Sequence, residues 1–345
     1  MHTRTPLQVA EQINGDGINI VVDLGGHLSV TSQVALALQP APLAVNYLSW
    51  LATSGAPYIQ TFLTDAVATP PEYIRHHSEA VSYLPYSYQV NSNRYTHTHH
   101  YNPKARYTLL HPPHQPQGPP PPVTDDAVVF ANFNQLFKID PETAHAWAQI
   151  LAATPDSVLT MLNFTGAPEG SRRLQRFLTP TAAAGSDRVL FSPFCASKHD
   201  FLLLAAGADI FLDNFFYNAG TTGSDVMFVG LPVLTRPGAR TLARMGASLA
   251  IKGLGYTGLV VRDAEDYVDL ARALARNRRK LARVRSRVHR QQRRGSLFDA
   301  DRWVESYEVF LHVLWDAGVL GGVATGGGQA TQGQRHLVIA TLAGV

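Results

Sequence analysis

Cysteine is almost missing from the chain, since Cys195 is the only one among 345 residues. A single thiol excludes an internal disulfide, which is typical of proteins from a reducing compartment. Cys195 has no evident activating partner in the sequence, and we expect it to be an inert residue of the core.

Charge and long apolar runs are scarce as well. Asp, Glu, Lys and Arg make up 16% of the residues, and the net charge is +3, so the chain as a whole is not a polyelectrolyte. No stretch is apolar for the roughly 18 residues that a membrane-spanning helix needs, and the polar N-terminus lacks the apolar run of a signal peptide. We therefore expect a soluble cytoplasmic or nuclear protein without a membrane partner, whose chain opens almost directly into a strand.

Short apolar runs are present throughout the chain, which is 45% hydrophobic. Near-continuous apolar runs followed by turn residues are typical of buried parallel strands. In the first ninety residues such runs predict strands at residues 18–24, 43–48, 58–63 and 80–83.

A segment rich in His and Pro interrupts this pattern and contains four consecutive prolines. Such a composition buries too little apolar surface to order itself, and polyproline makes it a stiff linker. We therefore divide the chain into a partial N-terminal half, the linker, a second half and a Gly-rich tail, over residues 1–90, 91–123, 124–317 and 318–345.

Strands and helices alternate strictly in the second half. The predicted strands are residues 127–131, 157–161, 188–192, 210–212 and 231–235. The predicted helices are residues 141–152, 171–178 and 222–229. This alternation predicts βαβ units on a parallel sheet, whose ligands bind at the carboxyl ends of the strands.

The most specific local motif is the Gly-Thr-Thr-Gly turn within residues 213–225, which follows a strand and opens a helix. The N–H groups at a helix start, the hydroxyls of Thr221 and Thr222, and the positive end of the helix dipole together favour a phosphate. Asp225 lies about one turn further, within reach of a ribose hydroxyl. The alternative is an ordinary N-cap, since Thr and Ser at helix starts commonly only cap.

Two further loops lie at the same predicted edge of the sheet. In the first, Lys138 can neutralise phosphate charge and Gln135 can bind a base or a phosphate. In the second, Lys198 and His199 can contact a nucleotide. For each loop the alternative is a solvated surface segment without a ligand.

The histidines of the linker have a metal-like density but no completing cysteine pair or carboxylate. They are His97, His99, His100, His111 and His114. We interpret them as low-complexity sequence and expect no metal.

Residues 271–295 hold eleven Lys and Arg and no acid, so the rest of the chain is net −8. An apolar stripe at helical spacing runs through the segment, formed by Leu270, Leu274, Leu281, Val284 and Val288. It predicts one amphipathic helix with a basic, solvated face. A nucleic-acid footprint is the weaker alternative, because interleaved aromatic residues are missing.

Several of these motifs, in the same order, resemble the carboxyl-terminal catalytic region of the protein O-linked N-acetylglucosamine transferase family. The resemblance runs from about residue 16 to residue 317, with the His/Pro segment as a gap. It is carried by residues 38–42, 53–57, 132–141, 191–193, 212–213, 218–225 and 230–235, together with Arg244 and residues 247–248.

The resemblance implies an α/β fold of GT-B type, with a complete C-terminal Rossmann-like half, a partial N-terminal one and the nucleotide sugar in the cleft. It also implies inverting transfer of N-acetylglucosamine from UDP-GlcNAc to Ser and Thr hydroxyls of intracellular proteins, without a metal or other cofactor.

Site residues follow by position in the family's motifs. Gln135 and Lys138 match uridine-diphosphate contacts, and Lys138 would stabilise the departing diphosphate. Thr221 and Thr222 match the phosphate-binding pair, Asn218 belongs to the same motif, and Asp225 matches the ribose-side carboxylate. Ala196 and Lys198 match the segment that frames uracil, whereas Leu48 and Thr53 fall in a loop that lines the sugar from the other half.

The chain also departs from the family pattern. Gly220 stands where the family has a histidine, residues 201–204 are apolar where a basic residue or histidine follows Lys198, and Ser29 and Ser32 replace basic positions. The upstream catalytic segment and the tetratricopeptide repeats of the family are not found. Fewer cations around a diphosphate predict weak or absent activity of this chain alone. A non-catalytic UDP-binding or scaffold protein and an N-glucosyltransferase using UDP-glucose remain as alternatives.

Overall fold

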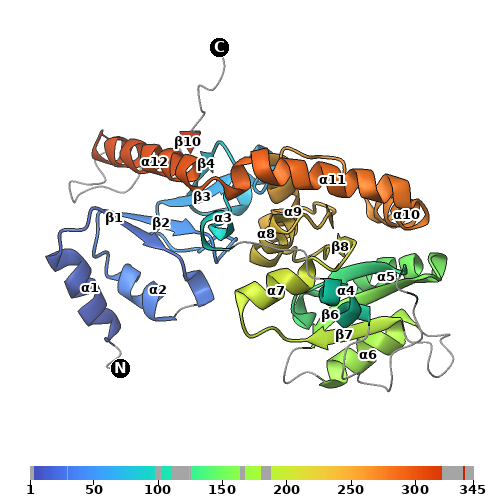
Figure 1. Cartoon of the computed structure of the whole chain (residues 1–345). Coiled ribbons are helices and arrows are strands. Elements are labelled where there is room, and N and C mark those ends of the chain that lie inside the picture. The colour runs from blue at the N-terminus through green and yellow to red at the C-terminus, as the bar shows by residue number, and fades with distance from the viewer. Residues whose placement is uncertain are drawn as a thin grey trace, which may run out of the picture. The chain divides into compact units, whose positions relative to one another are not determined.

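The computed structural model describes residues 4–28, 30–97, 103–110, 124, 126–163, 168–179, 188–320 and 337–338. The chain forms two compact units, each built on a parallel sheet (Figure 1). Unit 1 comprises residues 1–88, 240–242 and 300–345, and unit 2 comprises residues 89–239 and 243–299.

Unit 1 is centred on a parallel sheet with the strand order β1-β2-β3-β4-β10. Its strands are β1 (Ile20–Asp23), β2 (Leu43–Tyr47), β3 (Thr61–Asp65), β4 (Ala80–Leu84) and β10 (Leu337–Val338). Its α-helices are α1 (Pro6–Gly15), α2 (Val30–Ala37) and α12 (Ala300–Leu320), with short 3-10 helices at Gly26–Leu28 and Pro71–His76. Figure 1 shows α12 along one side of this sheet, with α1 and α2 on the other. Every residue of β2 and β3 is buried, as expected for strands covered on both faces.

Two helices of unit 1 correct the sequence analysis. The chain does not open directly into a strand, because α1 precedes β1, and a capping box between Thr5 and Gln8 starts that helix. Likewise α12 extends past residue 317 and belongs to unit 1. Its Trp303 and Tyr307 stack on each other at a centroid distance of 4.9 Å, and Trp303 also stacks on Tyr47 of β2 at 5.9 Å. Because Tyr47 and Trp303 are far apart in the sequence, their packing produces no periodic pattern in the sequence of β2 or of α12.

Unit 2 has the strand order β7-β6-β5-β8-β9, all parallel. The strands are β5 (Val128–Asn132), β6 (Ser157–Asn163), β7 (Val189–Pro193), β8 (Ile210–Leu212) and β9 (Val233–Leu234). The α-helices are α3 (Asn93–Thr96), α4 (Pro103–Leu110), α5 (Pro141–Ala153), α6 (Pro168–Leu178), α7 (Lys198–Ala205), α8 (Thr221–Phe228), α9 (Met245–Ser248), α10 (Ala264–Arg276) and α11 (Arg278–Arg294). The strand order reverses between β5 and β8, the point at which doubly wound sheets bind ligands. The five strands expected here all form, with small shifts of their ends.

The boundary at the His/Pro segment differs from the prediction. Residues 89–110 join unit 2, and α4 lies inside the expected linker. Leu109 and Leu110 are fully buried in the core of unit 2, so this part of the segment does bury apolar surface. Its apolar pair was hidden by the surrounding His and Pro composition. Residues 98–102 and 111–123 lie outside the described part, and with them His99, His100, His111 and His114.

The basic segment forms two helices, so the expectation of one helix is wrong. The backbone of Asn277 leaves helical geometry (φ −127°, ψ 88°), which ends α10, and its side chain accepts a hydrogen bond from Lys280 N to cap α11. The predicted apolar stripe is nevertheless on the inner face, with Leu274, Leu281 and Val288 buried. Within the described residues, none of the helices is long and apolar enough to cross a membrane.

Candidate functional site

The carboxyl edge of the unit 2 sheet is held by a network of asparagine side chains. Asn132 Nδ2, at the end of β5, donates to Leu212 O at 2.7 Å and to Asn214 Oδ1 at 2.6 Å. Asn134 Nδ2 donates to the same Asn214 oxygen at 3.2 Å. These bonds fix the loops that follow β5 and β8 against each other, at the point where the strand order reverses.

Lys138 stands at this edge, in the short 3-10 helix Leu136–Lys138. Its ammonium lies 3.9 Å from the centroid of the Tyr217 ring, a cation–π contact that holds the side chain toward the loop after β8. Burial lowers the pKa of Lys138, and the charge of Asp213 opposes that shift. Gln135, which immediately precedes this turn, is exposed.

Asp213 follows β8 and is fully buried. Its carboxylate accepts hydrogen bonds from Ala219 N at 2.8 Å, Asn214 N at 3.0 Å and Thr235 Oγ1 at 2.8 Å. Burial raises the pKa of Asp213 to about 7, although these bonds and the charge of Lys138 oppose the rise. Sequence reasoning did not assign Asp213 a role, although an acid directly after an apolar strand was a usable signal.

The helix α8 begins with the predicted Thr pair. Gly220 is its N-cap residue, so neither Thr221 nor Thr222 caps the helix; they are its first two residues. Thr221 is exposed and Thr222 half-buried, which leaves hydroxyls and backbone N–H groups together at a helix start. The ordinary N-cap alternative therefore does not hold for these two residues.

Asn218 and Gly220 shape the approach to α8. Asn218 is fully buried, donates to Asn214 O and accepts a bond from Gly246 N at 3.2 Å, so it holds the loop in place. A Cβ atom at Gly220 would lie 3.2 Å from Met245 Sδ. The space beside Gly220 is therefore partly filled by a methionine side chain.

Asp225 and Lys198, predicted from separate loops, are brought together as an ion pair. The Asp225 carboxylate is nearly buried and also accepts bonds from Asn93 Nδ2 at 2.9 Å and Asn91 Nδ2 at 3.5 Å. Both asparagines come from the expected linker and were missed. Their Asn-Ser-Asn pattern just before the His/Pro segment was the only available signal.

The segment expected to frame uracil is partly helical. Lys198 and His199 begin α7, which Ser197 caps by accepting a bond from Asp200 N, so the expectation of a loop here is wrong. Ala196 is exposed on the turn that precedes the helix. Cys195 is half-buried on the same turn, and burial raises the pKa of its thiol, which fits an unreactive residue.

Leu48 and Thr53 lie in unit 1, on the loop after β2. Leu48 adopts φ +72°, and Ser49 N donates to Tyr47 O at 3.0 Å across it, which makes a γ-turn of the rare, strained kind. Thr53 Oγ1 donates to Glu79 Oε2 at 2.7 Å and accepts a bond from Ser78 N at 3.0 Å. The Thr53 hydroxyl therefore stabilises the loop itself.

The side chain of Glu79 holds this loop in place through hydrogen bonds, and sequence reasoning missed this residue. It is 1% exposed and accepts bonds from Ser54 N at 2.7 Å, from Thr53 and, at 3.5 Å, from Asn46 Nδ2. Burial tends to raise the pKa of Glu79, but the hydrogen bonds from Ser54 and Thr53 outweigh it, so the pKa is lowered. The buried group is therefore an ionised carboxylate.

The remaining predicted positions add little to either cluster. Ser32 is half-buried in α2, and Ser29 lies outside the described residues. In the part of the chain that the structure describes, no three His, Cys, Asp or Glu side chains gather as a metal site would require.

The chain matches the protein-family model described as Glycosyl transferase family 41 over residues 4–108 and 121–307. The chain is 33% identical over 311 residues to a probable UDP-N-acetylglucosamine–peptide N-acetylglucosaminyltransferase SEC of Arabidopsis thaliana, covering 89% of this chain and 30% of that protein. It is 30% identical over 310 residues to a SPINDLY protein of the same description from Petunia hybrida, covering 89% and 31%. The chain thus spans about a third of the length of these relatives.

Among solved structures, a variant of the Thermobaculum terrenum O-GlcNAc transferase matches with a TM-score of 0.75 and 30% identity, covering 92% of this chain and 57% of that one. Anabaena HepE in complex with UDP and glucose matches with a TM-score of 0.59 and 13% identity, covering 88% and 81%, a likeness of fold alone. These neighbours are GT-B glycosyltransferases, and they confirm the predicted α/β fold of GT-B type.

Proposed function

Because the chain belongs to glycosyl transferase family 41, we propose that the protein transfers N-acetylglucosamine from UDP-GlcNAc to Ser and Thr hydroxyls of proteins, with inversion at the sugar. The two relatives named above are described as probable peptide N-acetylglucosaminyltransferases, and this supports the sugar and the type of acceptor. We also propose a cytoplasmic or nuclear site of action, in keeping with the single cysteine.

One observation carries the proposal: three segments that follow strands of unit 2 bring cations, hydroxyls and backbone N–H groups to the carboxyl edge of its sheet, and two of these segments flank the point where the strand order reverses. The loop after β5 brings Lys138, the turn before α7 leads to Lys198, and the loop after β8 brings the start of α8. A diphosphate needs N–H donors and cations within a small space, and a helix start beside lysines supplies both.

Each residue has a proposed role toward UDP-GlcNAc. Thr221 and Thr222 bind the phosphates with the N–H groups of α8, and Lys138 stabilises the charge that develops on the departing diphosphate. Asp225 holds the ribose, and Lys198 frames the uracil. Gln135 and Ala196 contact the uridine, Asn218 keeps the loop in shape, and Leu48 and Thr53 of unit 1 line the sugar. Lys138 takes the part that a divalent metal plays in other transferases, so no metal or other cofactor is required.

Calorimetric titration with UDP tests the donor site. Lys138→Ala and Thr222→Val are expected to weaken UDP binding by at least tenfold, because each removes a group that contacts a phosphate. Lys280→Ala on α11 and Thr257→Val on an exposed turn are matched controls that should bind as the wild type does. Absence of UDP binding to the wild type would contradict the assignment of the site.

Transfer of labelled sugar to a Ser/Thr peptide, with UDP-GlcNAc and UDP-glucose in parallel, tests the reaction. Transfer of N-acetylglucosamine to the hydroxyl is the expected result. UDP binding without transfer would favour the non-catalytic UDP-binding alternative, and glucose transfer to asparagine would favour N-glucosylation.

A further inference from the structure

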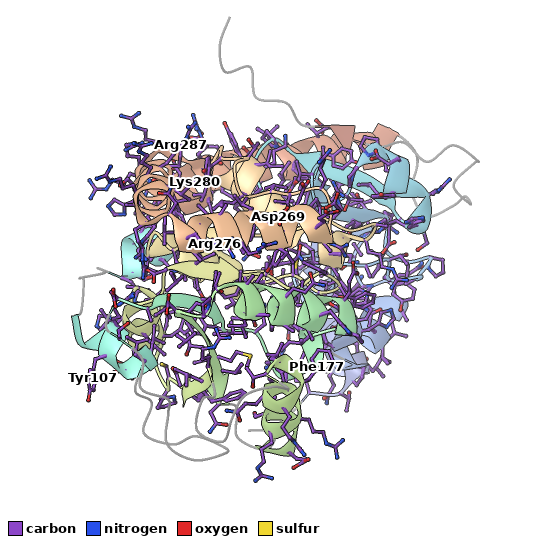
Figure 2. The ribbon with its side chains drawn as sticks, turned by 90° about the vertical axis from the view of Figure 1, so that its right-hand side faces the viewer. Tyr107, Phe177, Asp269, Arg276, Lys280 and Arg287 are labelled. Atoms are coloured by element: carbon purple, nitrogen blue, oxygen red, sulfur yellow. The ribbon has the colours of Figure 1, made fainter. Side chains whose placement is uncertain are left out.

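The outer face of α11 carries a continuous stripe of cations. Its members follow one another at spacings of three and four residues, which places them on one side of the helix. They are Lys280, Arg283, Arg287, Arg290 and Arg294, and all are exposed. The stripe extends over about 21 Å at 1.5 Å per residue. Figure 2 shows Lys280 and Arg287 along α11, with Arg276 near the end of α10.

Within the described residues, no carboxylate oxygen lies within 4.0 Å of a charged nitrogen of the stripe. The stripe is therefore not neutralised by ion pairs with this part of the chain. Arginines on other helices of unit 2 differ. On α6, Arg172 and Arg173 both pair with Glu169 at 3.0 Å, and on α10 Arg272 pairs with Asp269 at 3.1 Å. Like charges three and four residues apart destabilise a helix, so α11 depends on its buried face and its Asn277 cap.

A hollow of about 260 Å³ lies beside the first half of α11. It is lined by Arg106, Arg278 and Arg285 around Asp209, which pairs with Arg285 at 2.8 Å and Arg106 at 3.1 Å. Asp126, which is exposed, is the other acid near Arg106 and Arg278. Three guanidinium groups against two carboxylates leave the hollow positive, which favours a further carboxylate entering it.

The far end of α11 reaches the candidate donor site within unit 2. Arg94 donates to Gln292 O at 3.3 Å and to Arg293 O at 3.1 Å, and the adjacent residue Asn93 donates to Asp225. The end of α11, which carries Arg294 of the stripe, is therefore joined through Arg94 and Asn93 to Asp225, whereas the hollow lies on the opposite side of this helix.

The chemistry of the face identifies the kind of polyanion. A helix that binds a membrane surface exposes large apolar residues, whereas the apolar residues Leu281 and Val288 of α11 are buried in unit 2. Single-stranded nucleic acid is bound by aromatic rings interleaved with cations. Residues 278–294 of α11 contain no Phe, Tyr or Trp, and the ring of Tyr256, with Arg287 5.3 Å from its centroid, is half-buried. The exposed rings of Tyr95 and Tyr107 belong to α3 and α4. An acidic polypeptide can bind to exposed cations such as those of the stripe without apolar or aromatic residues beside them.

We propose that the α11 stripe forms a docking surface for an acidic segment of the protein acceptor, an inference that rests on the proposed function. The acceptors are then polypeptides that carry a run of Asp or Glu in addition to the modified Ser or Thr. Electrostatic docking of this kind speeds the encounter and concentrates the acceptor, so it lowers the acceptor KM and leaves kcat unchanged.

The test uses the full chain and two labelled Ser/Thr peptides that differ only in a flanking run of Glu or Gln. Fluorescence anisotropy without donor should give tighter binding of the Glu peptide, with an affinity that falls steeply as salt is raised. A triple variant Arg283→Gln, Arg287→Gln, Arg290→Gln should lose about tenfold of that affinity. The matched control on α6, Arg172→Gln, Arg173→Gln, Arg176→Gln, should retain it, and both variants should bind UDP as the wild type does.

The outcomes separate this inference from the proposed function. Equal binding of the two peptides, or an unaffected triple variant, would overturn the docking surface even when sugar transfer is observed. Tighter binding of a single-stranded oligonucleotide or of phosphatidylserine vesicles at the same salt would also overturn it, in favour of another polyanion. Stripe-dependent binding of the Glu peptide without any transfer would support the docking surface and contradict the proposed function.

Discussion

Lys198 and Asp225 form an ion pair in which the carboxylate side chain is 4% exposed and the lysine 39% exposed. Lys198 is the first residue of α7 and Asp225 lies in the second turn of α8, so the pair joins the two helices at the candidate donor site. Asn93 donates to the other carboxylate oxygen, so Asp225 is held by a partly exposed ammonium on one side and a buried amide on the other. A ribose hydroxyl that approaches Asp225 therefore meets an acceptor already oriented by its neighbours.

The energy of this pair can be measured with a double-mutant cycle. Lys198→Ala, Asp225→Asn and the double variant are expected to show a coupling of about 1 kcal/mol in the free energy of unfolding, since one partner is partly solvated. Urea unfolding of the four proteins provides the values. Additive effects of the two substitutions would mean that the pair contributes nothing to stability.

Stability should fall as the pH rises through the titration of Asp213. The folded-state pKa of about 7 lies above the ordinary value of 3.8, so the native state holds its proton where the unfolded chain has lost it. The contribution is fully present below pH 4 and is lost between about pH 4 and pH 7, on the order of 4 kcal/mol at most. Asp213→Asn keeps the shape of the side chain without the titration.

The difference in unfolding free energy between the wild type and Asp213→Asn isolates this group from all others. We expect it to change by several kcal/mol between pH 4.5 and pH 7.5, with the wild type losing more stability than the variant. Parallel pH profiles of the two proteins would show that Asp213 is ionised throughout.

Loss of the Glu79 charge should loosen the loop after β2. Glu79→Gln is expected to lower the free energy of unfolding by about 1–3 kcal/mol, because the loop loses hydrogen bonds to a buried carboxylate. Under the proposed roles of Leu48 and Thr53 toward the sugar, the donor KM should rise more than kcat falls. Glu72→Gln, at an exposed position of unit 1, is the matched control for unfolding and kinetics, and an equal effect of the two would contradict the role of Glu79.

A histidine at position 220 should strengthen UDP binding. The side chain of Gly220→His would add a donor at the N-cap of α8, next to the proposed phosphates, and a several-fold gain in affinity is expected. Because the new Cβ lies 3.2 Å from Met245 Sδ, the methionine must shift, at a cost of about 1 kcal/mol or less. Calorimetry with UDP and thermal unfolding measure the two effects, and weaker UDP binding at unchanged stability would refute the expected contact.

Chelation should leave activity intact. If Lys138 alone balances the diphosphate charge, transfer measured in the presence of EDTA should equal that in its absence, whereas Lys138→Met should abolish it. Restoration of transfer in a chelated sample by added Mg²⁺ or Mn²⁺ would show that a metal is required.

The sequence predicted the sheets well, because apolar runs such as Val128–Asn132 report buried parallel strands directly. Prediction failed where a few informative residues stand within a segment of different composition or pattern. Leu109 and Leu110 lie among histidines and prolines, and α1 is too polar for a periodic pattern. At Asn277 the apolar stripe continues across the break, so periodicity alone joins two helices into one.

The candidate site was predicted as a set of residues but not as an arrangement. Lys138, Thr222 and Asp225 stand in recognisable motifs, so their placement at one edge follows from the parallel topology. The positions of their partners could not be predicted in this way, because Tyr217, Asn93 and Asp213 act through contacts that only the folded chain creates. The raised pKa of Asp213 depends on burial, which no spacing in the sequence records.

The placement of α12 has a consequence for how the protein is made. Unit 1 takes its strands β1 to β4 from the start of the chain and α12 from a segment that follows all of unit 2. During synthesis, unit 2 can complete its fold as soon as residue 299 has left the ribosome. Until α12 has been synthesised, the first strands of unit 1 lack the aromatic ring of Trp303 that stacks on Tyr47. Strands β1 to β4 are thus synthesised before unit 2 but covered after it, and a nascent chain halted at residue 299 should present an open apolar sheet to chaperones.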